Sequence, residues 1–142
     1  MALYKTIFYV DDDSDDLELF KIAVEKADDE LSLFSMPDEM LLAMNNPPPT
    51  PSIIFLDLNM PHKSGHEVLK DIRSNPIFKE VPIVILSTAN GAPIIEQCWE
   101  EGADLYMTKF SSLPVFVKAL KHVINTDWKN RPRLRETFLF RP

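Results

Sequence analysis

The chain has 142 residues, the size of one domain with a single substantial core. Hydrophobic residues make up 45% and charged residues 26%, a composition typical of a folded globular protein and not of a disordered one. No apolar run approaches a membrane span of roughly 20 residues. The first strand pattern leaves no room for a signal peptide, and a single cysteine excludes an internal disulfide. We therefore expect a cytoplasmic protein with no membrane contact.

The charge of the chain is unevenly distributed. The formal net charge of −7 argues against non-specific nucleic-acid binding by the body of the chain. Residues 126–142 contain five basic and two acidic residues, a charge of +3, which leaves −10 for residues 1–125. We therefore predict a domain over 1–125 followed by a basic, aromatic tail over 126–142, with no output domain.

Apolar runs alternate with amphipathic stretches along the predicted domain. We predict strands at 7–10, 31–36, 53–56, 83–86 and 105–107. Helices are predicted at about 14–27, 37–44, 64–75, 93–101 and 112–124, from apolar residues at helical spacing. Strands that alternate with helices in this way predict an α/β fold with a doubly wound, five-stranded parallel sheet.

Local signals mark where several of these elements begin and end. Ser14 is the predicted N-cap of the first helix, and Ser64 and Glu67 have the spacing of a capping box. Gly102 is the predicted stop of the fourth helix. The prolines within 47–51 predict a stiff connector into the third strand.

The third predicted strand ends in a carboxylate. The apolar residues 53–56 run directly into Asp57, and an ionised group at the end of a buried strand is costly unless something pairs with it. Asp11 and Asp12 follow the first strand, Ser87 ends the fourth, and Lys109 follows the fifth. Because sites of open α/β sheets lie at the carboxyl ends of the strands, we expect these side chains to converge.

Such a group of side chains favours phosphoryl chemistry. Carboxylates held close together repel one another, so that either their pKa values rise or a cation lies between them. Oxygen ligands in this number favour Mg²⁺, which often bridges carboxylates to a phosphoryl group. A lysine and a serine would supply charge and a hydrogen bond to phosphate oxygens. The pattern predicts phosphoryl transfer onto an aspartate.

These motifs resemble the receiver domain of two-component response regulators, of the stand-alone type. The match covers residues of roughly 5 to 125, with the motifs in the family's order. The matching residues are the pair Asp11-Asp12, the segment 57–61 followed by Gly65, Ser87 after Pro82, and Tyr106 with Lys109. The resemblance implies a flavodoxin-like (βα)5 fold with strand order 2-1-3-4-5.

The resemblance also implies roles for the acidic residues. Asp57 would accept a phosphoryl group from a histidine kinase or a phosphotransfer protein. Mg²⁺ would be held by Asp11, Asp12 and Asp57, together with the backbone carbonyl of Asn59. The chain would then be a phosphoacceptor and not an enzyme, with slow Mg²⁺-dependent autodephosphorylation.

The remaining implied roles concern signalling. Ser87 and Lys109 would contact the phosphoryl group, and Tyr106 would be an aromatic switch that moves with Ser87. The surface of the fourth helix, fifth strand and fifth helix would then change its affinity for a downstream protein, which the sequence does not identify. Two residues depart from the family pattern: Phe110 follows Lys109 where proline is usual, and Thr88 stands where a smaller residue is usual.

Three alternative functions are compatible with the fold class. A degenerate receiver would bind partners without being phosphorylated. A flavodoxin-like protein would bind a nucleotide or flavin phosphate, but it needs a glycine-rich or hydroxyl-rich loop where this chain has aspartates. A hydrolase with an Asp-x-Asp motif would need a second acid where Asn59 stands.

Other reactive residues and the tail have simpler interpretations. His62 and His66 follow Asp57 without a partner cluster, so we expect a loop residue and a helix-surface residue. Cys98 is expected to pack in the core. The tail either folds back over the acidic domain or, as its aromatic and arginine content suggests, contacts a partner. A homodimer would use the tail or the face of the fourth helix, fifth strand and fifth helix.

Overall fold

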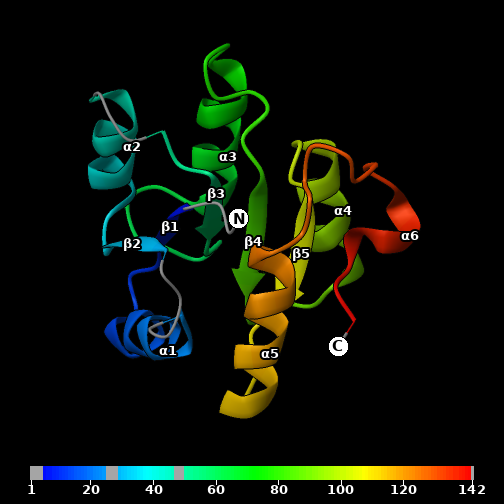
Figure 1. Ribbon diagram of the computed structural model, residues 1–142. Helices are drawn as coiled ribbons and strands as arrows, with labels where there is room; N and C mark the ends of the chain where they lie inside the picture. Colours follow the sequence, from blue (N-terminus) through cyan, green and yellow to red (C-terminus); the bar gives the residue numbers. More distant parts are fainter. Residues whose placement is uncertain (1–4, 25–28, 47–49, 142) are drawn as a thin grey trace.

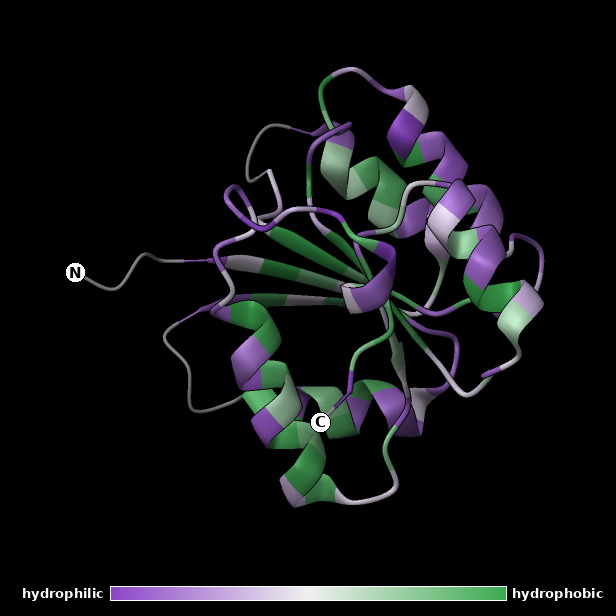
Figure 2. Ribbon diagram, turned by 90° about the vertical axis from the view of Figure 1, so that its right-hand side faces the viewer, coloured by the Kyte–Doolittle hydropathy of each residue, from purple (hydrophilic) through white to green (hydrophobic). Residues whose placement is uncertain are grey.

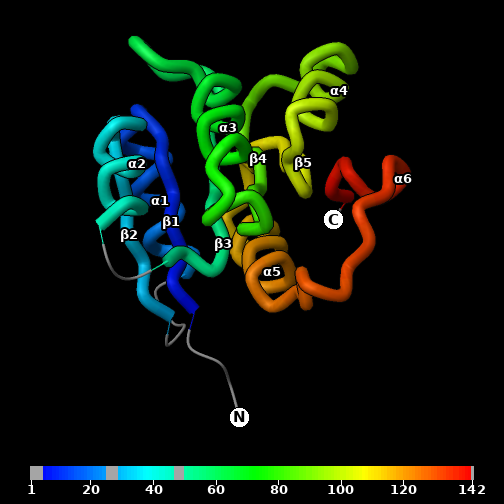
Figure 3. The backbone as a smooth tube through the Cα atoms, turned by 90° about the horizontal axis from the view of Figure 1, so that it is seen from above, coloured from blue at the N-terminus to red at the C-terminus, as the bar shows by residue number. Residues whose placement is uncertain are grey.

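The structure is a computed structural model that describes residues 5–24, 29–46 and 50–141 (Figure 1). A parallel sheet lies at its centre, with the strand order β2-β1-β3-β4-β5, as the row of strands in Figure 3 shows. The strands are β1 (Thr6–Val10), β2 (Glu30–Phe34), β3 (Ile53–Leu56), β4 (Ile83–Ser87) and β5 (Leu105–Thr108). The predicted fold class and strand order are confirmed.

Helices cover both faces of the sheet. They are α1 (Ser14–Val24), α2 (Pro37–Asn45), α3 (Gly65–Ser74), α4 (Ala92–Glu100), α5 (Leu113–Ile124) and the short α6 (Arg135–Phe138). α1 and α5 pack against one face, while α2, α3 and α4 pack against the other. Within the described residues, no helix combines the length and apolar character that crossing a membrane would need.

Each face of the sheet has its own hydrophobic core. Because successive strand side chains point to opposite faces, Ile7 and Tyr9 join the core beneath α1 and α5. Phe8 and Val10 join the core beneath α2, α3 and α4. Figure 2 shows the strands as hydrophobic ribbons between the helical layers. Burial on both faces explains the unbroken apolar runs of the sequence.

Hydrogen bonds of the sheet continue just past the strand ends and fix the site residues. The backbone N–H of Asp57 donates to the carbonyl oxygen of Val10 at 3.1 Å, and that of Asp11 donates to Phe34 at 3.0 Å. The backbone N–H of Lys109 donates to the carbonyl oxygen of Ser87 at 2.8 Å. The carboxyl edge is therefore set by the register of the sheet itself.

Helix termini agree with the sequence in part. Ser64 caps α3 as predicted, since its Oγ accepts from the backbone N–H of Glu67 at 3.3 Å. The predicted cap of α1 is wrong: Ser14 is the first helical residue, and Asp13 Oδ1 accepts from the backbone N–H of Asp15 at 2.9 Å. Gly102, with φ +98°, follows the end of α4 as predicted. The predicted helix end near residue 27 and the prolines at 47–49 lie outside the described residues.

The tail folds back along the outer edge of β5 and onto α4, as Figures 1 and 3 show. Phe138 is only 4% exposed, and its ring lies 5.3 Å from Trp99 and 6.5 Å from Tyr106, centroid to centroid. Leu139 forms a parallel bridge with Tyr106, and the backbone N–H of Phe140 donates to the Tyr106 carbonyl oxygen at 2.8 Å. The tail is folded back over the domain, and its predicted contact with a partner stays a prediction.

Arginines of the tail hold it to the end of α4. The guanidinium of Arg133 lies 3.8 Å from the centroid of the Trp99 ring, and its Nε donates to the carbonyl oxygen of Ala103 at 2.9 Å. Arg135 pairs with Glu96 of α4 at 2.7 Å. The basic tail therefore forms ion pairs and hydrogen bonds with the acidic domain of the same chain.

Candidate functional site

The acidic residues predicted to converge do so at the carboxyl edge of the sheet. Asp11, Asp12 and Asp57 each offer a carboxylate oxygen, and these oxygens all lie within 4.8 Å of one another. Asp11 is 0% and Asp57 is 4% exposed, whereas Asp12 is exposed. Two carboxylates are thus buried side by side, and a third opens the cluster toward solvent.

Lys109 reaches the same cluster. Its Nζ lies 2.8 Å from Asp11 Oδ2, 2.6 Å from Asp16 Oδ2 and 3.4 Å from Asp57 Oδ1. Lys109 reaches the carboxylates although Phe110, not proline, follows it, and the Phe110 ring lies 6.1 Å from that of Phe116, centroid to centroid. Part of the negative charge of the buried carboxylates is therefore balanced within the chain.

Two members of this network were not predicted. Asp16, in the first turn of α1, forms an ion pair with Lys109. The hydroxyl of the buried Tyr9 donates to Asp11 Oδ2 at 2.5 Å. The sequence contained a signal for Tyr9, because residues two apart in a strand share a face. It contained none for Asp16, whose position depends on how α1 packs.

The charges of the network shift the protonation of its members. Burial raises the pKa of Asp57 to about 6, with repulsion from Asp11 adding to the rise and Lys109 opposing it. Burial alone would lower the pKa of Lys109, but its hydrogen bonds to Asp11 and Asp16 raise it overall. Burial and the nearby Asp11 raise the pKa of Tyr9, so this phenol remains a hydrogen-bond donor. Asp57 is therefore harder to ionise in the folded protein than in water, chiefly because it is buried and also because Asp11 lies nearby.

The raised pKa of Asp57 gives a prediction about stability. Because the pKa of Asp57 rises on folding, its ionisation destabilises the fold as pH increases, and Asp57→Asn removes that penalty. A rise from 3.8 to about 6 corresponds to a gain of about 1–3 kcal/mol in the free energy of unfolding, present above about pH 6 and absent below about pH 4. Urea unfolding in EDTA across this range measures it.

The matched control for that measurement is Asp12→Asn, since Asp12 belongs to the cluster but its side chain is exposed. We expect a smaller gain for this variant, because an exposed carboxylate keeps most of its hydration. Equal stabilities of the wild-type protein and Asp57→Asn at pH 8 would contradict the electrostatic account of the site.

Ser87 and Tyr106 meet at one residue of the following loop. Ser87 is fully buried, and its Oγ accepts from the backbone N–H of Ala89 at 3.2 Å. The hydroxyl of Tyr106 donates to the carbonyl oxygen of Ala89 at 2.7 Å. Thr88 is exposed. Tyr106 is also fully buried, with the tail residue Phe138 beside it. The loop after β4 is therefore tied both to the end of β4 and, through Tyr106, to the tail.

The donor atoms of the acidic cluster suit a hard divalent cation. They are carboxylate oxygens, which Mg²⁺ prefers, and the exposed Asp12 leaves the cluster open to water ligands. The second oxygen of Asp11, Oδ1, accepts from the backbone N–H of Asp13 at 2.9 Å, which orients this carboxylate. Asn59 lies exposed in the loop after β3, close in sequence to Asp57. The residues present thus fit Mg²⁺.

The histidines near Asp57 in sequence do not enter the acidic network. His62 is exposed in the loop after Pro61, with φ 70°, in agreement with the predicted loop position. The prediction that His66 lacks a partner is wrong, since its Nδ1 lies 2.5 Å from Glu101 Oε1. Cys98 is buried in the core as predicted and belongs to the same group of side chains as His66 and Glu101.

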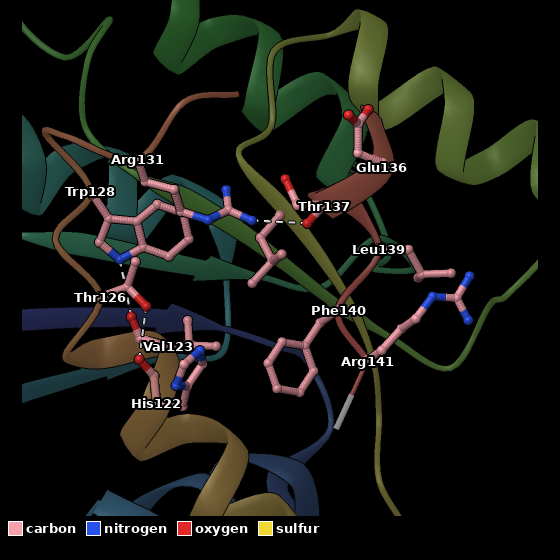
Figure 4. A pocket seen from close by; sticks show the side chains of 11 residues that line it. His122, Val123, Thr126, Trp128, Arg131, Glu136, Thr137, Leu139, Phe140 and Arg141 are labelled. Atoms are coloured by element: carbon pink, nitrogen blue, oxygen red, sulfur yellow. Dashed lines mark hydrogen bonds between the residues drawn. The ribbon is translucent and has the colours of Figure 1, made fainter. Parts of the chain in front are cut away.

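A cavity of about 370 Å³ lies away from this edge, between the end of α5 and the tail (Figure 4). Arg131 crosses it, with its guanidinium 5.0 Å from the Trp128 ring centroid and its Nη2 donating to the Thr137 carbonyl oxygen at 2.8 Å. Other lining residues include His122, Phe140 and Arg141. The cavity contains no member of the acidic cluster, so its chemistry is separate from that of Asp57.

Curated relatives match part of the chain. The chain is 36% identical over 75 residues to the response regulator Rcp1 of Synechocystis sp., which is 53% of this chain and 51% of Rcp1. It is 43% identical over 58 residues to the two-component response regulator ARR6 of Arabidopsis thaliana, covering 41% of this chain and 31% of ARR6. The matched stretch therefore spans about half of Rcp1 and about a third of ARR6.

Solved structures match more of the chain. The phosphorylated cyanobacterial phytochrome response regulator RcpA superposes with a TM-score of 0.78 at 28% identity, over 94% of this chain and 99% of RcpA. The Mn²⁺-bound form of Rcp1 gives a TM-score of 0.77 at 26% identity, over 92% and 99% of the two chains. The family model described as the response regulator receiver domain matches residues 7–121. With most of its length within that match, this chain belongs to the response regulator receiver domain family.

Proposed function

We propose that the chain is a phosphoryl-accepting signalling protein that receives a phosphoryl group on Asp57 from a histidine kinase or a phosphotransfer protein. The observation that carries this proposal is the buried Asp57 carboxylate, with Lys109 Nζ 3.4 Å away and Asp11 and Asp12 in the same cluster. The crystal structure of phosphorylated RcpA, which shares the fold, supports it.

The transfer follows from the positions of the side chains. A carboxylate oxygen of Asp57 attacks the phosphorus atom, an O–P bond forms, and the N–P bond to the donor imidazole breaks. Lys109 lies where it can neutralise phosphoryl oxygens, and Ser87 ends the adjacent strand with a hydroxyl. Mg²⁺, held by Asp11, Asp12, Asp57 and the backbone carbonyl of Asn59, would neutralise charge on the transferred group.

The signal would leave the site through the loop after β4. If Ser87 turns toward a phosphoryl group, its hydroxyl releases the backbone N–H of Ala89. The carbonyl oxygen of Ala89 accepts a hydrogen bond from the Tyr106 hydroxyl, so a movement of Ala89 would reach Tyr106. Tyr106 in turn contacts the tail at Phe138 and Phe140. The proposed partner surface of α4, β5 and α5 therefore includes the tail, and a homodimer through this surface is one form that its output could take.

Intact mass measured before and after incubation with acetyl phosphate tests the proposal. We expect a gain of one phosphoryl group with Mg²⁺, no gain in EDTA, and a slow Mg²⁺-dependent loss after the donor is removed. A protein that gains no mass under any of these conditions, yet binds partners, would instead be a degenerate receiver. A nucleotide-binding function is disfavoured because the loop after β1 presents Asp11, Asp12 and Asp13 to an incoming anion.

A further inference from the structure

Three side chains with nitrogen, sulfur and oxygen donors meet between α3 and α4. His66 is the second residue of α3, and Cys98 and Glu101 lie at the end of α4. His66 Nδ1 lies 2.5 Å from Glu101 Oε1. One donor atom from each residue, including Cys98 Sγ, lies within 4.8 Å of the others. The group belongs to the face of the sheet covered by α2, α3 and α4, not to the acidic edge.

Burial distinguishes this group from a surface ion pair. Cys98 is 0% exposed, and the side chain of Glu101 is 7% exposed, which is unusual for a carboxylate unless it is paired. The side chain of His66 is 21% exposed and forms the solvent side of the group. Cys98 and Glu101 stand three residues apart on one helix, a spacing that places both on one face. Two helices thus present three ligand-type side chains to one point.

We propose that His66, Cys98 and Glu101 bind a transition-metal ion, Zn²⁺ under ordinary conditions, between α3 and α4. A thiolate, an imidazole and a carboxylate are the ligand types of Zn²⁺, whereas Mg²⁺ prefers oxygen alone. Bond lengths of about 2.0–2.3 Å place tetrahedral ligand atoms about 3.3–3.8 Å apart. The donor atoms lie within 4.8 Å of one another, and the ion would open the His66–Glu101 pair from 2.5 Å to about 3.3 Å.

The ion would replace two protons. One lies in the short hydrogen bond between His66 and Glu101, and the other is on the Cys98 thiol. Three protein ligands leave a fourth position for water on the exposed side of His66. Gln97 Nε2 donates to Glu101 Oε2 at 3.3 Å, and this hydrogen bond would orient the carboxylate while its other oxygen, Oε1, binds the ion. Binding would fix α4 against α3 and stabilise the fold, since the unfolded chain lacks this arrangement.

Co²⁺ spectroscopy tests this site separately from the acidic cluster. Cys98 is the only cysteine of the chain, so a thiolate-to-cobalt charge-transfer band reports this site alone. With Mg²⁺ in excess, we expect the band to saturate at one Co²⁺ per chain and to disappear on addition of Zn²⁺. We also expect Zn²⁺ to raise the midpoint of thermal unfolding.

Variants distinguish the proposed ligands from neighbouring residues. Cys98→Ser removes the band, and His66→Gln, at a half-buried position that tolerates the change, weakens Zn²⁺ binding by at least about tenfold. His62→Gln, at the exposed loop histidine, is the matched control and keeps both signals. Wild-type protein that gives no charge-transfer band would overturn the proposal. So would a Zn²⁺-induced thermal shift that persists in His66→Gln but is lost in Asp57→Asn.

Discussion

Replacing Asp57 with asparagine is expected to abolish phosphoryl incorporation, from acetyl phosphate and from a histidine kinase alike. The amide has nearly the same shape as the carboxylate but is neutral and does not attack phosphorus. Lys109 keeps its partners Asp11 and Asp16 in this variant, so the network around the site stays in place. Intact mass, or radiolabel retained on the protein, measures the loss.

The control for that experiment is a variant that changes the charge near Asp57 but leaves Asp57 itself unchanged. Asp16→Asn is suitable, because Asp16 contacts Lys109 but lies outside the three-carboxylate cluster. We expect this variant to be labelled, at a changed rate. If Asp57→Asn were labelled at the wild-type level, the phosphoryl acceptor would be another residue. The higher stability predicted for Asp57→Asn would show that its loss of labelling is not caused by unfolding.

Gly65→Ala is expected to destabilise the fold by about 3 kcal/mol or more, because the added methyl group overpacks a rigid position. A Cβ at Gly65 would lie 2.2 Å from the backbone oxygen of Asp57 and 2.7 Å from Leu58 Cα. Both are backbone atoms, so no side-chain rotation relieves the clash. The Gly65 backbone N–H also donates to the Leu58 carbonyl oxygen at 2.9 Å, which fixes this close approach.

Urea unfolding of Gly65→Ala measures this effect, with Gly91→Ala as its matched control. A Cβ at Gly91 meets only Pro93 Cδ at 3.9 Å, an ordinary contact, and Gly91 has φ −72°. We expect its free energy of unfolding to change by no more than about 0.5 kcal/mol. Because the clash at Gly65 involves the main chain of Asp57 itself, Gly65→Ala should also slow labelling. A Gly65→Ala protein as stable as Gly91→Ala would contradict the packing derived for the start of α3.

The sequence was sufficient for features that follow from periodicity and strand direction. Asp57 and Asp11 could be placed at one edge because each directly follows a buried strand, and parallel strands end at the same edge. The same argument applied to Lys109, whose backbone N–H is held by Ser87.

Contacts that depend on how helices pack could not be predicted in this way. Asp16 reaches Lys109 because the first turn of α1 faces the acidic edge, and the pairing of His66 with Glu101 depends on the rotation of α3 and α4. Helical periodicity shows which face is buried, but not which residue of a neighbouring helix lies opposite. The cap of α1 was misassigned for a local reason, since Asp13 and Ser14 are both good capping residues.

The docked tail also has a consequence for self-association. β5 lies at the end of the sheet, where a strand presents unpaired backbone groups to other chains. The backbone N–H of Phe140 donates to the carbonyl oxygen of Tyr106 on this edge, and Phe138 covers the adjacent apolar surface. The tail thus protects this edge from strand addition and aggregation. An assembly formed by pairing two β5 edges would first have to release both tails, so the same segment sets a free-energy threshold for that form of oligomer.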